Sequence, residues 1–208
     1  SPPKKNKIIS VITSGKNFMP GHIQRLKFIN VLKNKYCDYI DFYGRDFKEV
    51  NDKSEGINNY KFHLCFENSI SKDYWTEKIS DPILGYSIPV YYGCKNINKY
   101  YKEGIINIDL NDFDSSIKII ENILSNYEEI YKKMTPHLKI NRNLILNKFN
   151  LIHFIENFYK KNIDSSLTDI KVVEIKSFDF FISNKILNFL VRFQRLFFKI
   201  ILKFKHKN

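Results

Sequence analysis

Six polar residues that follow an apolar segment carry the strongest chemical signal in the sequence. They stand in two groups after residues 60–66, Glu67-Asn68-Ser69 and Thr76-Glu77-Lys78. A helix that begins at the second group would offer free backbone N–H groups and its positive dipole end to an anion. Lys78 adds a positive charge suited to a diphosphate, and Glu77 can accept hydrogen bonds from a ribose diol. The pattern therefore predicts a site that binds a nucleotide.

The same residues have a simpler interpretation, and spacing alone leaves both open. Thr76 followed by Glu77 is typical of an ordinary helix start, with a capping hydroxyl and an acidic first turn. Glu67 and Asn68 either fix the sugar of a nucleotide or order the loop that joins strand and helix.

The surrounding sequence alternates between strand and helix patterns. Short runs rich in β-branched and aromatic residues predict five strands, at 7–12, 39–43, 60–66, 87–92 and 105–108. Apolar residues at helical spacing predict helices at 22–35, 74–84 and 113–124, and from 126 to about 161. The polar stretch 46–59 is predicted to be a loop with little structure. This alternation predicts an α/β fold, a Rossmann-like parallel sheet with flanking helices, followed by a helical C-terminal extension.

Ligands of a parallel sheet bind beyond the carboxyl ends of its strands. In the predicted order of elements, three segments that follow strands surround one crevice, at 14–25, 67–78 and 93–98. Arg25 and Lys78 are thereby placed around the same crevice.

The composition excludes several classes of protein. The chain has 208 residues, of which 43% are apolar and 15% aromatic, so it can bury a core and is not a disordered chain. Its 34 basic and 22 acidic residues give a net charge of +12. Three cysteines without C-x-x-C spacing argue against a disulfide framework or a zinc site and favour a reduced compartment.

A metal site is not expected, although one motif has the right spelling. Asp112-Phe113-Asp114 matches the D-x-D pattern with which some sugar-nucleotide transferases bind Mn²⁺. An Asp that caps the helix beginning at Phe113 explains the same residues, and we favour the cap because spelling alone is a weak signal. The histidines are scattered, without a cysteine or carboxylate at ligand spacing. His22 is notable because it opens the helix that carries Arg25.

Residues 185–207 combine an apolar and a basic helical face. Phenylalanine, leucine and isoleucine line one face and lysine and arginine another, which predicts a basic amphipathic helix bound to a membrane surface. A helix whose apolar face packs on another domain is the alternative. No stretch of 18 residues lacks charge, so no membrane-spanning helix is predicted.

Nucleic-acid binding is the rival class for a chain with a net charge of +12. Much of the excess charge lies in the basic tail, and the aromatic residues stand mostly in strands or on apolar helix faces without a recognition motif. We therefore expect no nucleic-acid partner.

Three motifs follow one another in a specific order: Y-K-F-x-L-C-F-E-N-S from Tyr60, D-Y-W-T-E-K-I from Asp73, and I-P-V-Y-Y-G from Ile88. Together they resemble the signature of the α1,3-fucosyltransferase family, glycosyltransferase family 10. The segments 14–32, 41–44 and 107–113 also fit this resemblance, which extends over about residues 8–124.

The resemblance implies a GT-B fold, of which this chain would be the C-terminal, donor-binding half. It implies an enzyme, an inverting transferase that moves fucose from GDP-fucose to a hydroxyl of a glycan acceptor, α1,3 to N-acetylglucosamine or glucose. By match to the motifs, Arg25 and Lys78 are the catalytic residues that contact the diphosphate. The substrate-binding residues that it implies are Ser14, Glu67, Asn68, Ser69, Tyr74, Thr76 and Glu77. Glu77 would bind the ribose, and Asn68 and Tyr74 would shape the pocket. No cofactor is required, and a divalent metal is compatible with the fold without being implied.

Two departures and one absence qualify the match. Gly15 stands where the family has Asn, and Trp75 replaces a small β-branched residue. The general base of the family, a Glu, lies in an N-terminal acceptor domain that is missing here, so this part alone is expected to bind the donor and transfer poorly. A non-catalytic module that binds a nucleotide or a partner protein is the alternative function.

Three parts are expected along the chain. They are a nucleotide-sugar-binding domain at 1–125, a helical extension packed on it at 126–161, and a linker with the basic tail at 162–208. The chain begins with Ser1 and shows no signal peptide, which suggests a piece of a longer protein. The expected location is cytoplasmic and peripheral on the inner membrane surface in a bacterium, or the Golgi membrane in a eukaryote.

Overall fold

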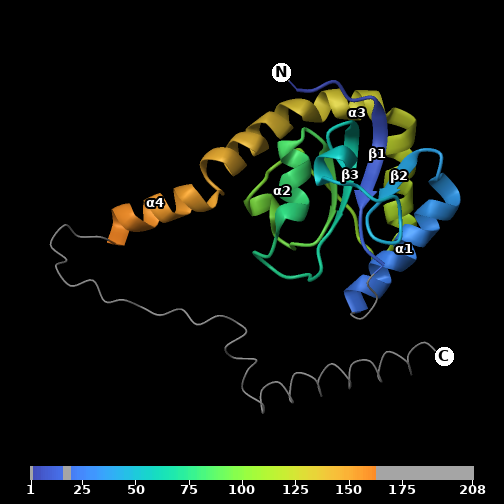
Figure 1. The fold of residues 1–208 in the computed structure, drawn as a ribbon, viewed down its shortest axis with the longest axis horizontal. Coiled ribbons are helices and arrows are strands. Elements are labelled where there is room, and N and C mark those ends of the chain that lie inside the picture. The colour runs from blue at the N-terminus through green and yellow to red at the C-terminus, as the bar shows by residue number, and fades with distance from the viewer. Residues whose placement is uncertain (1, 16–19, 163–208) are drawn as a thin grey trace, which may run out of the picture.

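The computed structural model describes residues 2–15 and 20–162 of the chain. Strands and helices alternate in this part (Figure 1). The strands are β1 (Lys7–Ile12), β2 (Ile40–Tyr43), β3 (Tyr60–Phe66), β4 (Ile88–Tyr92) and β5 (Ile106–Asn107). The α-helices are α1 (Pro20–Tyr36), α2 (Glu77–Leu84), α3 (Phe113–Asn147) and α4 (Leu151–Asn162). Two short 3₁₀ helices lie between strands, η1 (Lys53–Gly56) and η2 (Ile97–Lys99).

The five described strands form one parallel sheet in the order β2-β1-β3-β4-β5. The chain steps from β1 outward to β2, returns to β3, and then steps in the opposite direction to β4. Because such crossovers are right-handed, α1 and α2 lie on opposite faces of the sheet. The reversal occurs between β1 and β3, which is where a sheet of this kind binds its ligand. The predicted fold class is confirmed.

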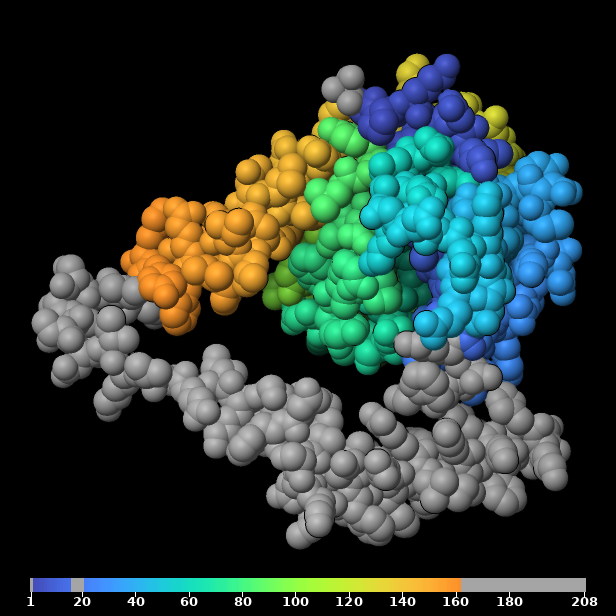
Figure 2. Space-filling view, in the orientation of Figure 1, coloured from blue at the N-terminus to red at the C-terminus, as the bar shows by residue number. Residues whose placement is uncertain are grey.

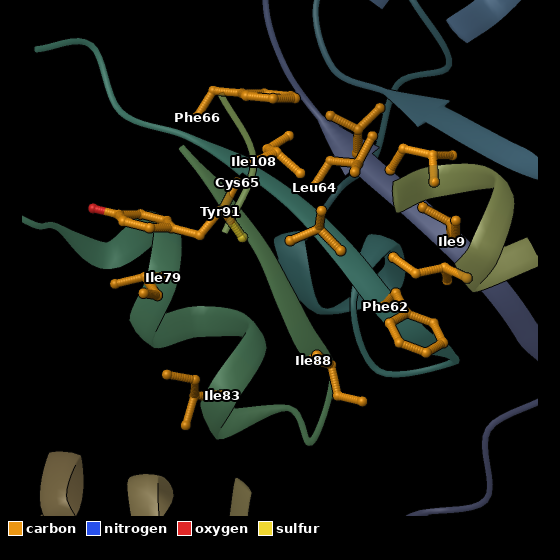
Figure 3. Close-up of a cluster of buried hydrophobic side chains, with 14 of the residues drawn as sticks. Ile9, Phe62, Leu64, Cys65, Phe66, Ile79, Ile83, Ile88, Tyr91 and Ile108 are labelled. Atoms are coloured by element: carbon orange, nitrogen blue, oxygen red, sulfur yellow. The ribbon is translucent and has the colours of Figure 1, made fainter. Parts of the chain in front are cut away.

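The core is built around β3, in which every residue is buried. A strand that is covered on both faces needs an almost continuous apolar run, as the sequence of β3 shows. Ile79 and Ile83 of α2 pack into this core from one side (Figure 3). On the side of α1, the rings of Phe28 and Phe113 lie 5.0 Å apart. Each fully buried side chain of this size contributes about 1.5–3 kcal/mol to the free energy of folding. This packing fixes the position of β3 and, with it, the polar residues that follow its carboxyl end.

Some boundaries differ from the prediction because tertiary contacts override local patterns. Helix α2 begins at Glu77 rather than near residue 74. The preceding loop contains Asp73 with φ of 58°, whose backbone N–H donates to Asn96 Oδ1 at 2.8 Å and whose carboxylate accepts from the hydroxyl of Tyr100. These contacts with the segment after β4 fix the loop in a form that is not helical.

The long helical region also differs in detail. The helix predicted to end at residue 124 continues to Asn147 as α3, with a non-helical backbone at Asn126. A short break separates it from α4, which extends away from the sheet (Figure 1). The stretch 46–59, predicted as a loop, contains η1.

The basic tail predicted at 185–207 lies outside the described residues. Its membrane binding, and the localisation derived from it, therefore stay predictions. Within residues 2–15 and 20–162, no helix combines the length and apolar character that crossing a membrane requires.

His63, in the middle of β3, makes the stability of this fold depend on pH. Its ring Nδ1 lies 2.8 Å from Ser10 Oγ, and burial lowers the pKa of the imidazole to about 3. Histidine in an unfolded chain titrates near pH 6.5, so the unfolded state binds more protons below that pH. The stability gained from neutral His63 is therefore fully present above about pH 6.5 and is lost as the pH falls toward 3.

When the pH is lowered from about 7.5 to about 5, we expect protonation of His63 in the unfolded state to decrease the free energy of unfolding by about 2 kcal/mol. Urea denaturation at the two pH values measures this decrease. The His63→Gln variant, which can still hydrogen-bond Ser10 but does not titrate, should lose most of this dependence. His153→Gln on α4 should keep it. Parallel pH profiles for wild type and His63→Gln would contradict the assignment.

Candidate functional site

A cavity of about 570 Å³ opens at the carboxyl ends of β1 and β3, where the order of the sheet reverses. Helices α1, α2 and η1 and the segment after β2 complete its walls. Figure 2 shows this hollow between the green surface of α2 and the cyan-to-blue surface that follows β2. Its lining includes the basic side chains of Arg25, Arg45, Lys53 and Lys78 and the acidic side chains of Glu77 and Asp81. Four cations against two carboxylates favour an anionic ligand.

Arg25 is the buried cation of this cavity. Its guanidinium donates to Asn68 Oδ1 and to the carbonyl oxygen of Ser14, both at 3.3 Å, and only 7% of the residue is exposed. No carboxylate in the described part of the chain pairs with it, and its Nε has no hydrogen-bond partner there. Burial lowers the pKa of the Arg25 guanidinium. A buried positive charge with only neutral partners is costly unless an anion joins it.

Glu67 orders the loop between β3 and α2. Its buried carboxylate accepts from the backbone N–H of Thr76 at 2.9 Å and from the Thr76 hydroxyl at 2.8 Å. Burial raises the pKa of this carboxyl, while the hydrogen bonds from Thr76 and the charge of Lys78, whose Nζ lies 3.9 Å away, act in the opposite direction. Neither Glu67 nor Thr76 lines the cavity. Of the two interpretations of Glu67, loop ordering is the one that these contacts support.

Thr76 caps α2, and the cap brings two candidate ligands to the cavity. The Thr76 hydroxyl accepts from the backbone N–H of Lys78 at 3.3 Å. Glu77 and Lys78 follow in the first turn and line the cavity, with Lys78 Nζ 3.1 Å from Glu77 Oε1. The capping and ligand-binding interpretations are therefore compatible, because different residues carry them.

The structure brings together five of the residues predicted for the site. They are Ser14, Arg25, Asn68, Glu77 and Lys78, all of which line the cavity. Ser69 and Tyr74 are exposed on the loop between β3 and α2 and do not line it. Trp75, the unusual residue of this loop, packs against the rings of Tyr100 and Tyr101 instead.

Three charged residues that line the cavity were not predicted from the sequence. Arg45 follows Gly44 at the carboxyl end of β2, so the position of that strand could have identified it. Asp81 stands one helical turn after Glu77, on the same face of α2. Lys53 lies in η1, inside the stretch that was predicted to have little structure, and no sequence signal marked it.

Asp112 caps α3, as predicted. Its side chain accepts from the backbone N–H of Ser115 at 3.0 Å and from the Ser115 hydroxyl at 2.7 Å. The described ranges contain no group of three or more His, Cys, Asp or Glu side chains arranged to hold a metal ion.

Comparisons with known proteins identify relatives of this chain. A sequence model described as glycosyltransferase family 10 (fucosyltransferase) C-term matches residues 2–142. The chain is 38% identical over 74 residues to the alpha-(1,3)-fucosyltransferase FucT of Helicobacter pylori. The aligned segment covers 35% of this chain and 16% of that protein. It is 39% identical over 117 residues to the 4-galactosyl-N-acetylglucosaminide 3-alpha-L-fucosyltransferase 9 of Mus musculus, which covers 54% of this chain and 31% of that protein.

A solved structure shows the same fold. The crystal structure of an alpha1,3-fucosyltransferase with GDP-fucose superposes with a TM-score of 0.50 at 28% identity, over 65% of this chain and 40% of that one. The sheet and helices described above thus correspond to the fold of a GT-B fucosyltransferase. The chain spans less than a third of the length of the two curated relatives described above. With residues 2–142 matched by the family, the chain belongs to glycosyltransferase family 10, the fucosyltransferases, and corresponds to the C-terminal region of that family.

Proposed function

We propose that this chain is the donor-binding part of an inverting fucosyltransferase. The enzyme would move fucose from GDP-fucose to a hydroxyl of a glycan, α1,3 to N-acetylglucosamine or glucose. The observation that carries the proposal is the cavity shared by Arg25, Asn68 and the first turn of α2. The names of the relatives, and a solved structure of similar fold with GDP-fucose, support the same donor.

Each lining residue has a role that fits its chemistry. Arg25 and Lys78 hold the diphosphate, because both present N–H donors and positive charge to the cavity. Glu77 accepts hydrogen bonds from the ribose hydroxyls. Asn68 accepts a hydrogen bond from the Arg25 guanidinium through its side-chain oxygen. Its amide nitrogen can then donate a hydrogen bond to GDP-fucose. Ser69 and Tyr74 are left out of this set because they do not line the cavity.

The reaction breaks the bond between the anomeric carbon of fucose and an oxygen of the diphosphate. The acceptor hydroxyl oxygen attacks that carbon from the opposite side, and its proton passes to a general base. The electron pair of the broken bond stays with GDP, so negative charge grows on the diphosphate in the transition state. Arg25 and Lys78 stabilise this charge from fixed positions, and such preorganised electrostatic stabilisation often contributes more to catalysis than any other effect.

In this proposal, the general base comes from a separate acceptor-binding domain. The match to the solved fucosyltransferase covers 40% of that chain, so the remainder of that protein is long enough to hold such a domain. The whole enzyme is then expected to transfer fucose, whereas the part described here is expected to bind the nucleotide.

The test is thermal stabilisation by GDP of Lys78→Ala and Glu77→Ala. At GDP of about ten times the wild-type Kd, the ligand should stabilise the wild type by about 1.4 kcal/mol, which is roughly 3–6 °C. Loss of a charge-assisted hydrogen bond should weaken binding about 30-fold and reduce this stabilisation to about 0.2 kcal/mol.

Lys72→Ala is the matched control, because Lys72 is an exposed lysine of the neighbouring loop that does not line the cavity. It should keep the full shift. If Lys78→Ala and Glu77→Ala also keep it, the assignment of these residues is wrong. Binding of GDP without any transfer of fucose by the longer enzyme would favour the non-catalytic module.

A further inference from the structure

An ion pair between Lys53 and Asp81 lines the cavity beside Glu77. Lys53 Nζ lies 3.1 Å from Asp81 Oδ2 and 3.9 Å from Glu77 Oε1. The side chains of Lys53 and Asp81 are 56% and 32% exposed, so both remain accessible to a ligand. Within the described residues, Asp81 Oδ1 accepts no hydrogen bond. The pair therefore offers a cationic donor and an unused carboxylate oxygen side by side.

The position of Asp81 follows from helix geometry. Asp81 stands four residues after Glu77, so it lies on the same face of α2, about 6 Å further along the axis. A ribose held by Glu77 would direct its base toward Asp81 and away from Arg25. The apolar side chains of Ile57 and Pro82 also line the cavity, and both are buried, so they offer a flat purine an apolar surface.

The chemistry of the pair matches one base better than the others. The hydrogen-bonding edge of guanine carries two adjacent donors, the N1–H and the N2 amino group, next to the O6 acceptor. A carboxylate can accept from both donors while an ammonium group donates to O6. Adenine places an acceptor nitrogen where the carboxylate would lie, and uracil has a single donor between two acceptors. The arrangement thus distinguishes guanine from both.

We propose that Asp81 and Lys53 read the guanine base of the donor nucleotide. This inference rests on the proposed function and adds to it the residues that select the base. Asp81 accepts from N1–H and the N2 amino group, and Lys53 donates to O6. Two parts of the cavity then contribute differently to the choice of nucleotide. The charges of Arg25 and Lys78 bind any nucleoside diphosphate, and the ion pair of Lys53 and Asp81 selects GDP.

The decisive experiment compares GDP with inosine diphosphate by isothermal titration calorimetry. The two nucleotides differ only in the N2 amino group. The wild type should bind GDP about 10-fold more tightly than inosine diphosphate, since one hydrogen bond to a charged group is lost. Asp81→Asn should weaken GDP binding by about 10-fold or more and bring the ratio of the two affinities close to one. Lys53→Gln should weaken both nucleotides alike, because both carry O6, and should leave the ratio unchanged.

Glu156→Gln is the matched control, because it neutralises a carboxylate that pairs with a lysine on the remote helix α4. Equal affinity of the wild type for GDP and inosine diphosphate, or an unchanged ratio in Asp81→Asn, would overturn this inference and leave the proposed function intact. A wild type that binds no GDP would overturn the proposed function and this inference together. If Asp81→Asn fails to fold, the wild-type ratio and Lys53→Gln still decide the matter.

Discussion

Replacing Arg25 with Met is expected to weaken GDP binding by about 100-fold and, at the same time, to make the unliganded protein more stable. The loss of binding follows from the removal of charge-assisted hydrogen bonds to the diphosphate, each of which contributes about 1.5–3 kcal/mol. Lys78 stays in place in this variant, so residual weak binding should persist.

The gain in stability has a separate cause. Arg25 is 7% exposed, its partners Asn68 and Ser14 are neutral, and burial lowers the pKa of its guanidinium. Among the described residues no carboxylate pairs with Arg25, so the unliganded protein bears the cost of a buried cation, which an anionic ligand would offset. Replacing it with an apolar side chain of similar length should raise the free energy of unfolding by about 1 kcal/mol, or about 2–4 °C in Tm.

Thermal denaturation with and without GDP measures both effects in one series. The control is Arg142→Met, because Arg142 is a helical arginine that stacks on Tyr86 and donates to the Leu84 carbonyl, with no contact with the cavity. It should bind GDP normally. If Arg25→Met lowers Tm in the absence of ligand, Arg25 has a structural role. The claim that Arg25 strengthens GDP binding at a cost in stability would then be wrong.

The strands could be predicted from the sequence because each one depends on a local pattern. In β3, buried on both faces, the apolar run coincides with the strand from Tyr60 to Phe66. The start of α2 was placed too early because the loop before it is fixed by Asp73 and residues after β4. No local pattern reports a contact between residues more than 20 positions apart.

The candidate site divides in the same way. Arg25 and Lys78 were predictable because the carboxyl-end rule for parallel sheets applies whatever the details of the loops. Lys53 was not, because its place at the cavity depends on how η1 packs beside α2, where Lys53 Nζ lies 3.1 Å from Asp81 Oδ2. The positions of the residues expected to hold phosphate thus follow from topology, whereas the position of Lys53 follows from packing.

Replacing Glu67 with Ala is expected to destabilise the protein by about 3 kcal/mol. Two hydrogen bonds from Thr76, at 2.9 and 2.8 Å, end on this buried carboxylate, and the variant would leave both donors and a small void beside the tip of β3. Because Thr76 is also the cap of α2, the first turn that carries Glu77 and Lys78 should become less ordered, and GDP binding should weaken although Glu67 does not line the cavity.

A double-mutant cycle separates this positioning role from direct contact with the nucleotide. Glu67→Ala and Thr76→Ala both remove the hydrogen bond between the Thr76 hydroxyl and Glu67, so the double variant should lose less stability and GDP affinity than the sum of the two single losses. Glu67→Gln retains one acceptor oxygen and should recover part of both. Additive losses in GDP affinity would show that Glu67 and Thr76 act separately on the ligand. The loop between β3 and α2 would then contribute to the site by contact as well as by position.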